Sequence, residues 1–449
     1  MRFKLSSFAS LAPRAGALPV LLIALAPAVS LADTNEPEDW NAKFQATYIW
    51  QGKQPFSAAY SGANSLSTGK EHSYSFSATA ALGLRPWAGG ELYFDPEAAQ
   101  GIPLSNLTGL GGFTNGEMAK SSGPRLKIYD ARLFLRQTWN QGGESEAVES
   151  AANQLAGSVD KRRWALTVGH MSILDVFDNN AYSHDPRTQF MNWSLMTHGA
   201  YDYAADARGY TWGAALEWYH DDWVIRGGRY LEPKEPDQQA LDWQIGKHYG
   251  DQIEVEHAHQ IGDQPGKLRG LLFRNYTKTS RYQDALDVAH LTGAVPDMNG
   301  VRTSNQVKYG AGLNLEQAIS PNVGMFARGS WANGKTEVYA FTEIDHSVAA
   351  GVTGKGTAWG RAEDSFGAAW VQNGLSQAHR KYLAAGGASF FLGDGGLNYK
   401  PESIVEVFYS LKMSKGVWMT LDWQRIQNPG YNADRGPALV TSVRMHTEF

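Results

Sequence analysis

The sequence contains no cysteine, which excludes a disulfide framework and any metal site built from thiolates. Beyond residue 29 it also lacks an apolar run long enough to cross a membrane as a helix. No stripe of basic residues could follow a phosphate backbone, and 45 acidic residues outnumber 40 basic ones, so no nucleic-acid partner is expected. The fold must therefore be held together by backbone pairing and packing alone.

The first 32 residues have the pattern of a cleaved secretory signal peptide. Basic residues at 2, 4 and 14 precede or flank an apolar run from Ala15 to Val29, and Ser30-Leu31-Ala32 supplies the small residues of a cleavage site. Cleavage after Ala32 removes three basic and no acidic residues, which leaves 37 basic residues against 45 acidic ones, a net charge near −8. The sequence therefore predicts export.

Glycine and aromatic residues are abundant in the rest of the chain, with 48 glycines and 12% aromatics over the whole sequence. A soluble periplasmic protein of this length would show long amphipathic helices and continuous apolar strands, and neither pattern is present. Segments of about ten residues alternate instead between apolar and polar side chains, which is typical of strands in a transmembrane β-barrel.

The alternation recurs along the chain, at 44–50, 74–84, 307–316, 403–411, 417–424 and 439–449. In 307–316, Tyr309, Leu313 and Leu315 alternate with polar residues or glycine, so that one face suits lipid and the other water. Aromatic residues lie at the ends of several apolar faces, as in the girdles of barrel proteins, and the chain ends in the terminal aromatic Phe449.

The connections between these segments have two lengths. Short ones lie at 85–89, 221–222, 320–322 and 414–416, and long ones at 96–124, 172–208, 276–304, 333–346 and 375–402. This order predicts an all-β, antiparallel transmembrane barrel of about sixteen strands with short periplasmic turns and long extracellular loops. We expect residues 1–32 to be the signal peptide, 33–41 a short periplasmic segment, and 42–449 the barrel.

One stretch breaks the pattern. Residues 141–160 are acidic and rich in Ala and Ser, and they are too many for an ordinary periplasmic turn. The composition leaves two interpretations open, a short helix or a flexible insert. A TonB-type transporter is excluded because about 22 strands and a plug would need a much longer chain.

Three segments, in the same order, resemble the carbohydrate-selective porin family (OprB family). They are the stretch from Val168 to Phe190, which contains Asp178-Asn179-Asn180 and Asp185-Pro186-Arg187; the stretch from Glu91 to Glu117; and the end of the chain from Asp422 to Phe449. The resemblance implies sixteen strands, a lumen narrowed by inward-folded loops, and uptake of monosaccharides or short oligosaccharides. The chain is accordingly expected to be a multi-pass protein of the Gram-negative outer membrane, in contact with its lipids.

A channel that prefers sugars needs amide and charged groups for the hydroxyls, and the planar fork of arginine suits vicinal hydroxyls well. In strand 126–139 we expect Tyr129, Ala131, Leu133 and Leu135 to face lipid, which turns Asp130, Arg132 and Arg136 into the lumen. By the same alternation, the inward side chains elsewhere are Glu91, Tyr93, Asp95 and Glu217.

The segment 172–208 is the best candidate for a loop that folds into the pore. Its candidate solute-contacting residues are Asp175, Asp178, Asn180, Arg187, Asp206 and Arg208. The competing interpretation is that such residues only build turns and ion pairs that pin a loop to the wall. His257 and His259, beside two glutamates, have metal-ligand spacing, but a polar lumen face explains them and no metal site is expected.

Three classes of function remain for such a barrel. The first is passive, sugar-preferring diffusion, with a general porin or a porin for another solute as its alternative. The second is a barrel hydrolase, but no HExxH, GxSxG or phosphate-binding motif is present, so neither catalysis nor a cofactor is expected. The third is an adhesin with a closed lumen. The sequence leaves open whether the barrel is a monomer or a homotrimer.

Overall fold

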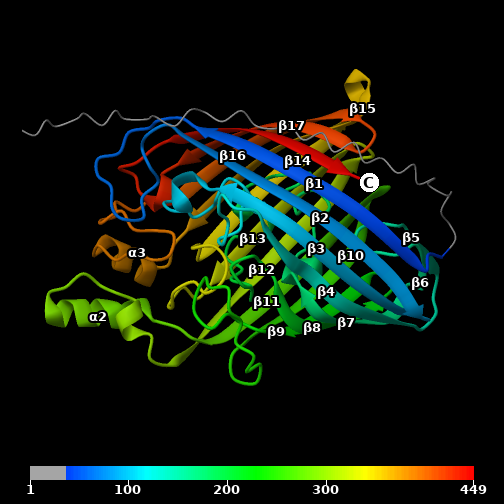
Figure 1. The fold of residues 1–449 in the computed structure, drawn as a ribbon, viewed down its shortest axis with the longest axis horizontal. Coiled ribbons are helices and arrows are strands. Elements are labelled where there is room, and N and C mark those ends of the chain that lie inside the picture. Colours follow the sequence, from blue (N-terminus) through cyan, green and yellow to red (C-terminus); the bar gives the residue numbers. More distant parts are fainter. Residues whose placement is uncertain (1–36) are drawn as a thin grey trace, which may run out of the picture. The chain divides into compact units, whose positions relative to one another are not determined.

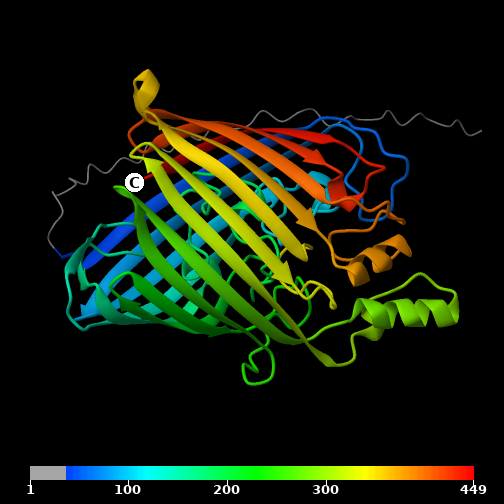
Figure 2. The same cartoon turned by 180° about the vertical axis from the view of Figure 1, so that it is seen from behind.

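The computed structural model describes residues 37–449, which form a closed antiparallel barrel of sixteen strands (Figures 1 and 2). The sequence-based prediction of an all-β porin-like barrel is confirmed. The barrel strands are β1 (Trp40–Lys53), β2 (Glu71–Trp87), β3 (Gly90–Ile102), β4 (Lys127–Asn140), β7 (Arg162–Met171), β8 (Thr211–His220), β9 (Trp223–Tyr230), β10 (Tyr249–Ile261), β11 (Gln264–Lys278), β12 (Asn305–Ser320), β13 (Val323–Ala332), β14 (His346–Gly356), β15 (Arg361–Gly374), β16 (Glu402–Ser414), β17 (Val417–Gln427) and β18 (Ala438–Glu448).

Helices are few and lie in the connections. They are α1 (Trp193–Met196), α2 (Tyr282–Thr292) and α3 (Gln377–Ala384), with 3₁₀ turns η1 (Leu104–Asn106), η2 (Ile173–Asp175), η3 (Asn299–Val301), η4 (Thr357–Trp359) and η5 (Pro429–Tyr431). None of the helices within 37–449 is long and apolar enough to cross a membrane. The expected signal peptide, 1–32, lies outside the described residues.

The alternation read from the sequence sets which side chains face outward. In β12 the side chain of Leu313 is 63% exposed on the outer surface, whereas its neighbour Asn314 is fully buried in the lumen. β17 repeats this with Leu421 outside and Thr420 inside. Since successive side chains of a strand point to opposite faces, the outer surface is an apolar belt and the lumen is polar.

The expectation for the first half of β4 is wrong. The pairing of β3 with β4 shifts register between Asp95 and Pro96, so β4 carries one extra residue there. Such a bulge reverses the inward and outward assignment on its far side. Tyr129 consequently faces inward and donates a hydrogen bond to Glu97, whereas Asp130 lies opposite Pro96 and is exposed.

The connections alternate between the two ends of the barrel. Turns such as 221–222, 262–263 and 415–416 join strands at the end where β1 begins and β18 ends. The loops that carry α2 and α3 lie at the other end (Figure 1). By the usual barrel topology, the short-turn end is the periplasmic one. The loop after β3 begins later than expected, at residue 103, because β3 continues to Ile102.

The insert 141–160 is neither a helix nor an unstructured segment. It forms a two-stranded antiparallel hairpin of its own, β5 (Ser145–Val148) paired with β6 (Gly157–Asp160), between β4 and β7. We call residues 141–160 the insert hairpin. Its position is at the short-turn end of the barrel (Figure 1).

The barrel closes where β1 pairs with β18. The last residue takes part in this seam: the backbone N–H of Phe449 donates to the carbonyl of Phe44 at 2.9 Å, and the N–H of Phe44 donates back at 3.2 Å. The two rings stack with centroids 6.4 Å apart.

Deletion of Phe449 is therefore expected to lower the yield of folded barrel, because two hydrogen bonds and an aromatic pair worth about 1–2 kcal/mol disappear from the seam. The heat-modifiable folded band on a gel measures this yield. Phe449→Tyr keeps the ring and should fold normally. Equal folded fractions with and without Phe449 would show that the residue is incidental to closure.

Candidate functional site

The loop between β7 and β8, residues 172–210, folds into the lumen and crosses it. On one side, the buried carboxylate of Asp178 accepts hydrogen bonds from Thr197 at 2.7 Å and from the backbone N–H of His198 at 2.8 Å, and it forms an ion pair with Arg328 of β13 at 3.2 Å. Burial opposes ionisation of Asp178, but Arg328 and His198 together lower its pKa to about 2. The loop is thus fixed to the wall by a permanent negative charge.

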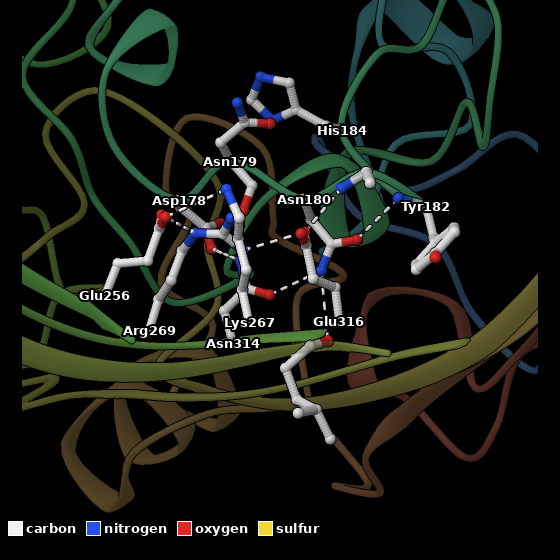
Figure 3. A network of polar contacts seen from close by, with 12 residues as sticks. Asp178, Asn179, Asn180, Tyr182, His184, Glu256, Lys267, Arg269, Asn314 and Glu316 are labelled. Carbon is white, nitrogen blue, oxygen red and sulfur yellow. Dashed lines mark hydrogen bonds and ion pairs between the residues drawn. The ribbon is translucent and has the colours of Figure 1, made fainter. Parts of the chain in front are cut away.

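Neighbouring residues of the same loop add further contacts to the wall, which Figure 3 shows from close by. The side-chain amide of Asn180 donates to Asn314 of β12 at 2.6 Å, and the backbone N–H of Ala181 donates to Glu316 at 2.8 Å. Asn180 also accepts a hydrogen bond from the N–H of Tyr182, at 2.9 Å, which shapes the turn. Asp178 and Asn180 therefore act as loop tethers, and they do not line the cavity.

The middle of the loop contacts two further strands, β16 and β17. Glu406 of β16 accepts hydrogen bonds from the backbone N–H groups of Met191 and Asn192, and the side chain of Asn192 donates to Gln424 of β17 at 3.0 Å. The loop 103–126 enters as well, because Glu402 accepts from the N–H of Gly112 at 2.8 Å. Two loops together narrow the channel.

A cavity of about 980 Å³ lies inside the barrel. Ten lysine or arginine and eight aspartate or glutamate side chains line it, so its charge is nearly balanced. The charged lining residues are Arg85, Glu91, Glu97, Glu117, Lys120, Arg132, Arg136, Arg163, Asp175, Asp185, Arg187, Asp206, Arg208, Glu217, Arg226, Glu256, Lys267 and Arg269.

Three arginines and two tyrosines gather where the loop 172–210 meets β3 and β4. We call this group, Arg132, Arg187, Arg208, Tyr129 and Tyr210, the eyelet. Arg132 binds Asp175 through two hydrogen bonds, at 2.8 and 2.7 Å, and lies 5.5 Å from the Tyr210 ring centre. Arg208 lies 4.6 Å from the ring centre of Tyr129. Both distances are within the range of a cation–π attraction, which favours these positions of the two guanidinium groups.

Arg187 holds two carboxylates of the eyelet wall. Its Nε donates to Glu117 and its terminal nitrogen to Glu97, each at 2.9 Å. Glu97 also accepts hydrogen bonds from Thr79 and Tyr129. The group is thus a cross-linked network of fixed donors and acceptors, in which a fifth or less of the Arg187 side chain remains open to the channel.

A second polar feature runs along the barrel wall. Glu217 of β8, Arg226 of β9, Glu256 of β10, Arg269 of β11 and Glu316 of β12 form a continuous chain of ion pairs with successive distances of 2.8, 3.1, 2.7 and 3.0 Å. Because each charge faces a partner on the next strand, the wall presents alternating charge and little net field.

Comparison with known proteins places the chain in a family. The sequence model of the family described as "Carbohydrate-selective porin, OprB family" matches residues 63–449. The chain belongs to the OprB family. No curated protein matches it.

Solved porin structures share the fold of this OprB-family protein. The high-pH structure of Pseudomonas putida OprB has a TM-score of 0.70 at 12% identity, covering 92% of this chain and 94% of the other. The low-pH structure of the same protein has a TM-score of 0.50 at 11% identity, covering 92% and 93%. The outer membrane channel DcaP of Acinetobacter baumannii has a TM-score of 0.51 at 8% identity, covering 92% and 97%.

The residues predicted for the site fall into three groups in the structure. Those that line the cavity of this porin are Glu91, Arg132, Arg136, Asp175, Arg187, Asp206, Arg208 and Glu217. Those buried behind the lining are Tyr93, Asp95, Asp178 and Asn180. The remaining one, Asp130, is on the outer side of the β4 bulge, which contradicts its expected inward position.

Sequence analysis missed several lining residues. Arg226 and Arg269 lie on strands whose alternation alone indicates an inward side chain, since Ile225 and Leu268 beside them are exposed. Tyr129 was assigned to lipid because the bulge is invisible in the sequence. Glu97 and Glu117 lie in a segment that resembles the family, but nothing in the sequence around them indicates a lining position. Their role becomes visible only where Arg187 forms ion pairs with both.

The two histidines of the predicted polar lumen face have partners other than each other. His257 stacks on Trp223 with ring centroids 4.2 Å apart, and His259 is hydrogen-bonded to Gln317 at 2.9 Å. Both rings therefore have partners that account for their position. Across residues 37–449 no group of three or more His, Cys, Asp or Glu side chains could hold a metal ion.

Proposed function

We propose that this porin is a passive channel of the outer membrane that prefers carbohydrates, as monosaccharides or short oligosaccharides, over charged solutes of equal size. The observation that carries the proposal is the cavity lining, in which arginine forks and tyrosine faces stand beside paired carboxylates at nearly balanced charge. A neutral, hydroxyl-rich solute can exchange hydrogen bonds with such a lining, whereas a charged solute gains little from it.

The cavity lining provides the two kinds of contact that a sugar ring needs. Arg132 and Arg208 keep 17% and 26% of their side chains exposed, so their outer N–H groups can donate to hydroxyls. Nearer the long-loop end, Trp193 and Phe341 line the cavity as a stacked pair with centroids 5.7 Å apart. Aromatic faces of this kind suit the C–H faces of a pyranose.

Liposome swelling tests the proposal. Glucose-sized sugars should enter faster than amino acids or anions of equal size, and Arg132→Ala should reduce that ratio about fivefold, the effect of losing one hydrogen bond of roughly 1 kcal/mol. Arg229→Ala serves as the control, because Arg229 is half exposed and does not line the cavity. Equal rates for all solutes of one size would reduce the protein to a general porin.

The other candidate functions make different predictions in the same preparation. A closed adhesin gives no current steps in a planar bilayer, and a barrel hydrolase loses lipid hydrolysis when a single serine is changed. We propose neither, because a cavity of about 980 Å³ lies inside the barrel and ion pairs and hydrogen bonds account for the charged residues that line it. Analytical ultracentrifugation in detergent distinguishes a monomer from the homotrimer that the sequence leaves open.

A further inference from the structure

The insert hairpin turns back into the barrel instead of projecting from it. Its tip residues Leu155 and Ala156 are each only 1% exposed, although they belong to a connection between strands. Leu155 belongs to the same buried apolar cluster as Tyr93 and Phe134. Gly83 of β2 leaves the room for it, since a Cβ at Gly83 would lie 3.2 Å from Leu155 Cδ2 and closer still to Tyr93. The apolar tip thus occupies a pocket in the barrel wall formed by Gly83, Tyr93 and Phe134, which we call the socket.

Hydrogen bonds fasten the hairpin to several strands. The side-chain amide of Asn41 in β1 donates to the carbonyls of Ala151 and Gln154, at 3.2 and 2.9 Å. Arg136 of β4 donates to the carbonyl of Asn153 at 3.1 Å, and the Asn153 amide donates to Asp95 of β3 at 2.8 Å.

Two further contacts complete the attachment. The N–H of Leu155 donates to the hydroxyl of Tyr93 at 3.1 Å, and Arg85 of β2 donates to the carbonyl of Ala156 at 3.2 Å. The hairpin thus contacts four strands, β1, β2, β3 and β4. Detaching it would cost more free energy than detaching a turn exposed on the surface, because buried donors would be left without partners. The hairpin is therefore a fixed part of the lumen.

The hairpin and the eyelet share one cavity. The residues of the hairpin that line this cavity are Val148, Ala152, Asn153, Gln154, Leu155, Gly157, Ser158 and Val159. Arg163 lines it as well; its guanidinium lies 3.7 Å from the ring centre of Tyr219 and donates to the carbonyl of Asp160 in the hairpin. A solute that has passed the eyelet therefore meets the hairpin before it leaves at the short-turn end.

We propose that the insert hairpin is a second constriction of the channel, which limits solute size at the short-turn end and presents Arg136, Arg163 and Tyr219 as an exit contact for hydroxylated solutes. The size limit follows from where the hairpin lies and does not depend on the solute. The exit contact rests on the proposed function, because it uses the same pairing of arginine with an aromatic face as the eyelet.

Removal of residues 144–160 tests the size limit. The cut leaves Gln141 paired with Arg162 around Gly142 and Gly143, which already have positive φ, so a short hairpin turn can replace the insert. Single-channel conductance should rise about twofold or more, and the largest oligosaccharide that enters liposomes should be longer for the deletion variant than for the full-length porin. Unchanged conductance and an unchanged size limit would overturn the proposal.

A second variant leaves the chain length intact in case the deletion fails to fold. Leu155→Asp places a carboxylate in an apolar socket, which expels the tip because burial of an unpaired charge is costly. Ala147→Asp makes the same charge change at an exposed position of the same hairpin and is the matched control. Only Leu155→Asp should raise conductance, and equal conductance of the two variants would contradict the inference.

A cross-link tests whether the constriction is fixed. The chain has no cysteine, so Asn41→Cys with Ser150→Cys, whose native side chains are 3.2 Å apart, introduces a single pair. Oxidised and reduced protein should conduct equally if the hairpin stays in place, whereas a difference would show a moving gate. If the full-length porin shows no sugar preference but the deletion still raises conductance, the proposed function is wrong and the second constriction is still supported.

Discussion

Asp178→Ala is expected to release the loop 172–210 from the wall and to open the channel. The variant leaves Arg328, whose side chain is 2% exposed, as a buried charge without its partner. Removing one member of a buried pair typically costs about 3–5 kcal/mol. It also removes the acceptor of Thr197 and of the His198 N–H. We expect a conductance several times larger, with irregular closures, and a lower melting temperature by circular dichroism.

The effect should depend on burial and not on the loss of a carboxylate as such. Asp251→Ala removes the partner of Arg229 on a solvent-accessible part of β10, where an ion pair contributes about 0–1 kcal/mol, and it should leave conductance and melting nearly unchanged. A normal conductance and melting temperature for Asp178→Ala would mean that the remaining contacts of Asn180, Ala181 and Asn192 hold the loop by themselves.

Arg187→Ala is expected to convert a weakly ion-selective channel into a cation-selective one. Arg187 neutralises Glu97 and Glu117 at the eyelet, and both carboxylates are more than nine-tenths buried in the channel wall. Without the guanidinium, two negative charges face the narrow passage, where screening by solvent is reduced. We expect the potassium-to-chloride permeability ratio, measured from the reversal potential in a salt gradient, to rise roughly tenfold.

Two companion variants separate charge from geometry in this prediction. Arg187→Lys keeps the charge but loses the fork, so it should preserve the ion ratio while it weakens sugar preference. Arg187→Ala combined with Glu117→Gln removes one of the two negative charges left without a partner and should restore part of the original ratio. An ion ratio that does not respond to Arg187→Ala would place the narrowest passage elsewhere, with the insert hairpin as the next candidate.

The barrel could be predicted because its determinants are local. In β12 and β17 the alternation with a period of two follows from strand geometry. A shift of one residue in the pairing of either strand would turn its polar side chains toward lipid and its leucines toward the aqueous lumen. The short turns at 221–222 and 415–416 leave little freedom in how their strands pair. The rule of alternation failed at β4, because a bulge arises from how two strands pair. Nothing in residues 126–139 alone marks the extra residue.

The site was only partly accessible from the sequence. Arg132, Arg136 and Glu217 follow from the alternation, but Asp178 and Asn180 lie in a loop whose path depends on Arg328 and Asn314, more than 130 positions away. Which loop residues tether and which face the channel is decided by those distant partners. The insert hairpin is a similar case, because only the socket formed by Gly83, Tyr93 and Phe134 turns it inward.

The sequence by itself determined that this protein is a membrane barrel with a polar lumen, since each strand must satisfy lipid on one side and water on the other within its own ten residues. The sequence also determined that the chain belongs to the OprB family, because residues 63–449 match the model of that family. The tertiary structure alone decided what narrows the lumen, because the two inward loops and the hairpin are held by charges and sockets on strands far away in the chain. Closure of the sheet brings those partners together.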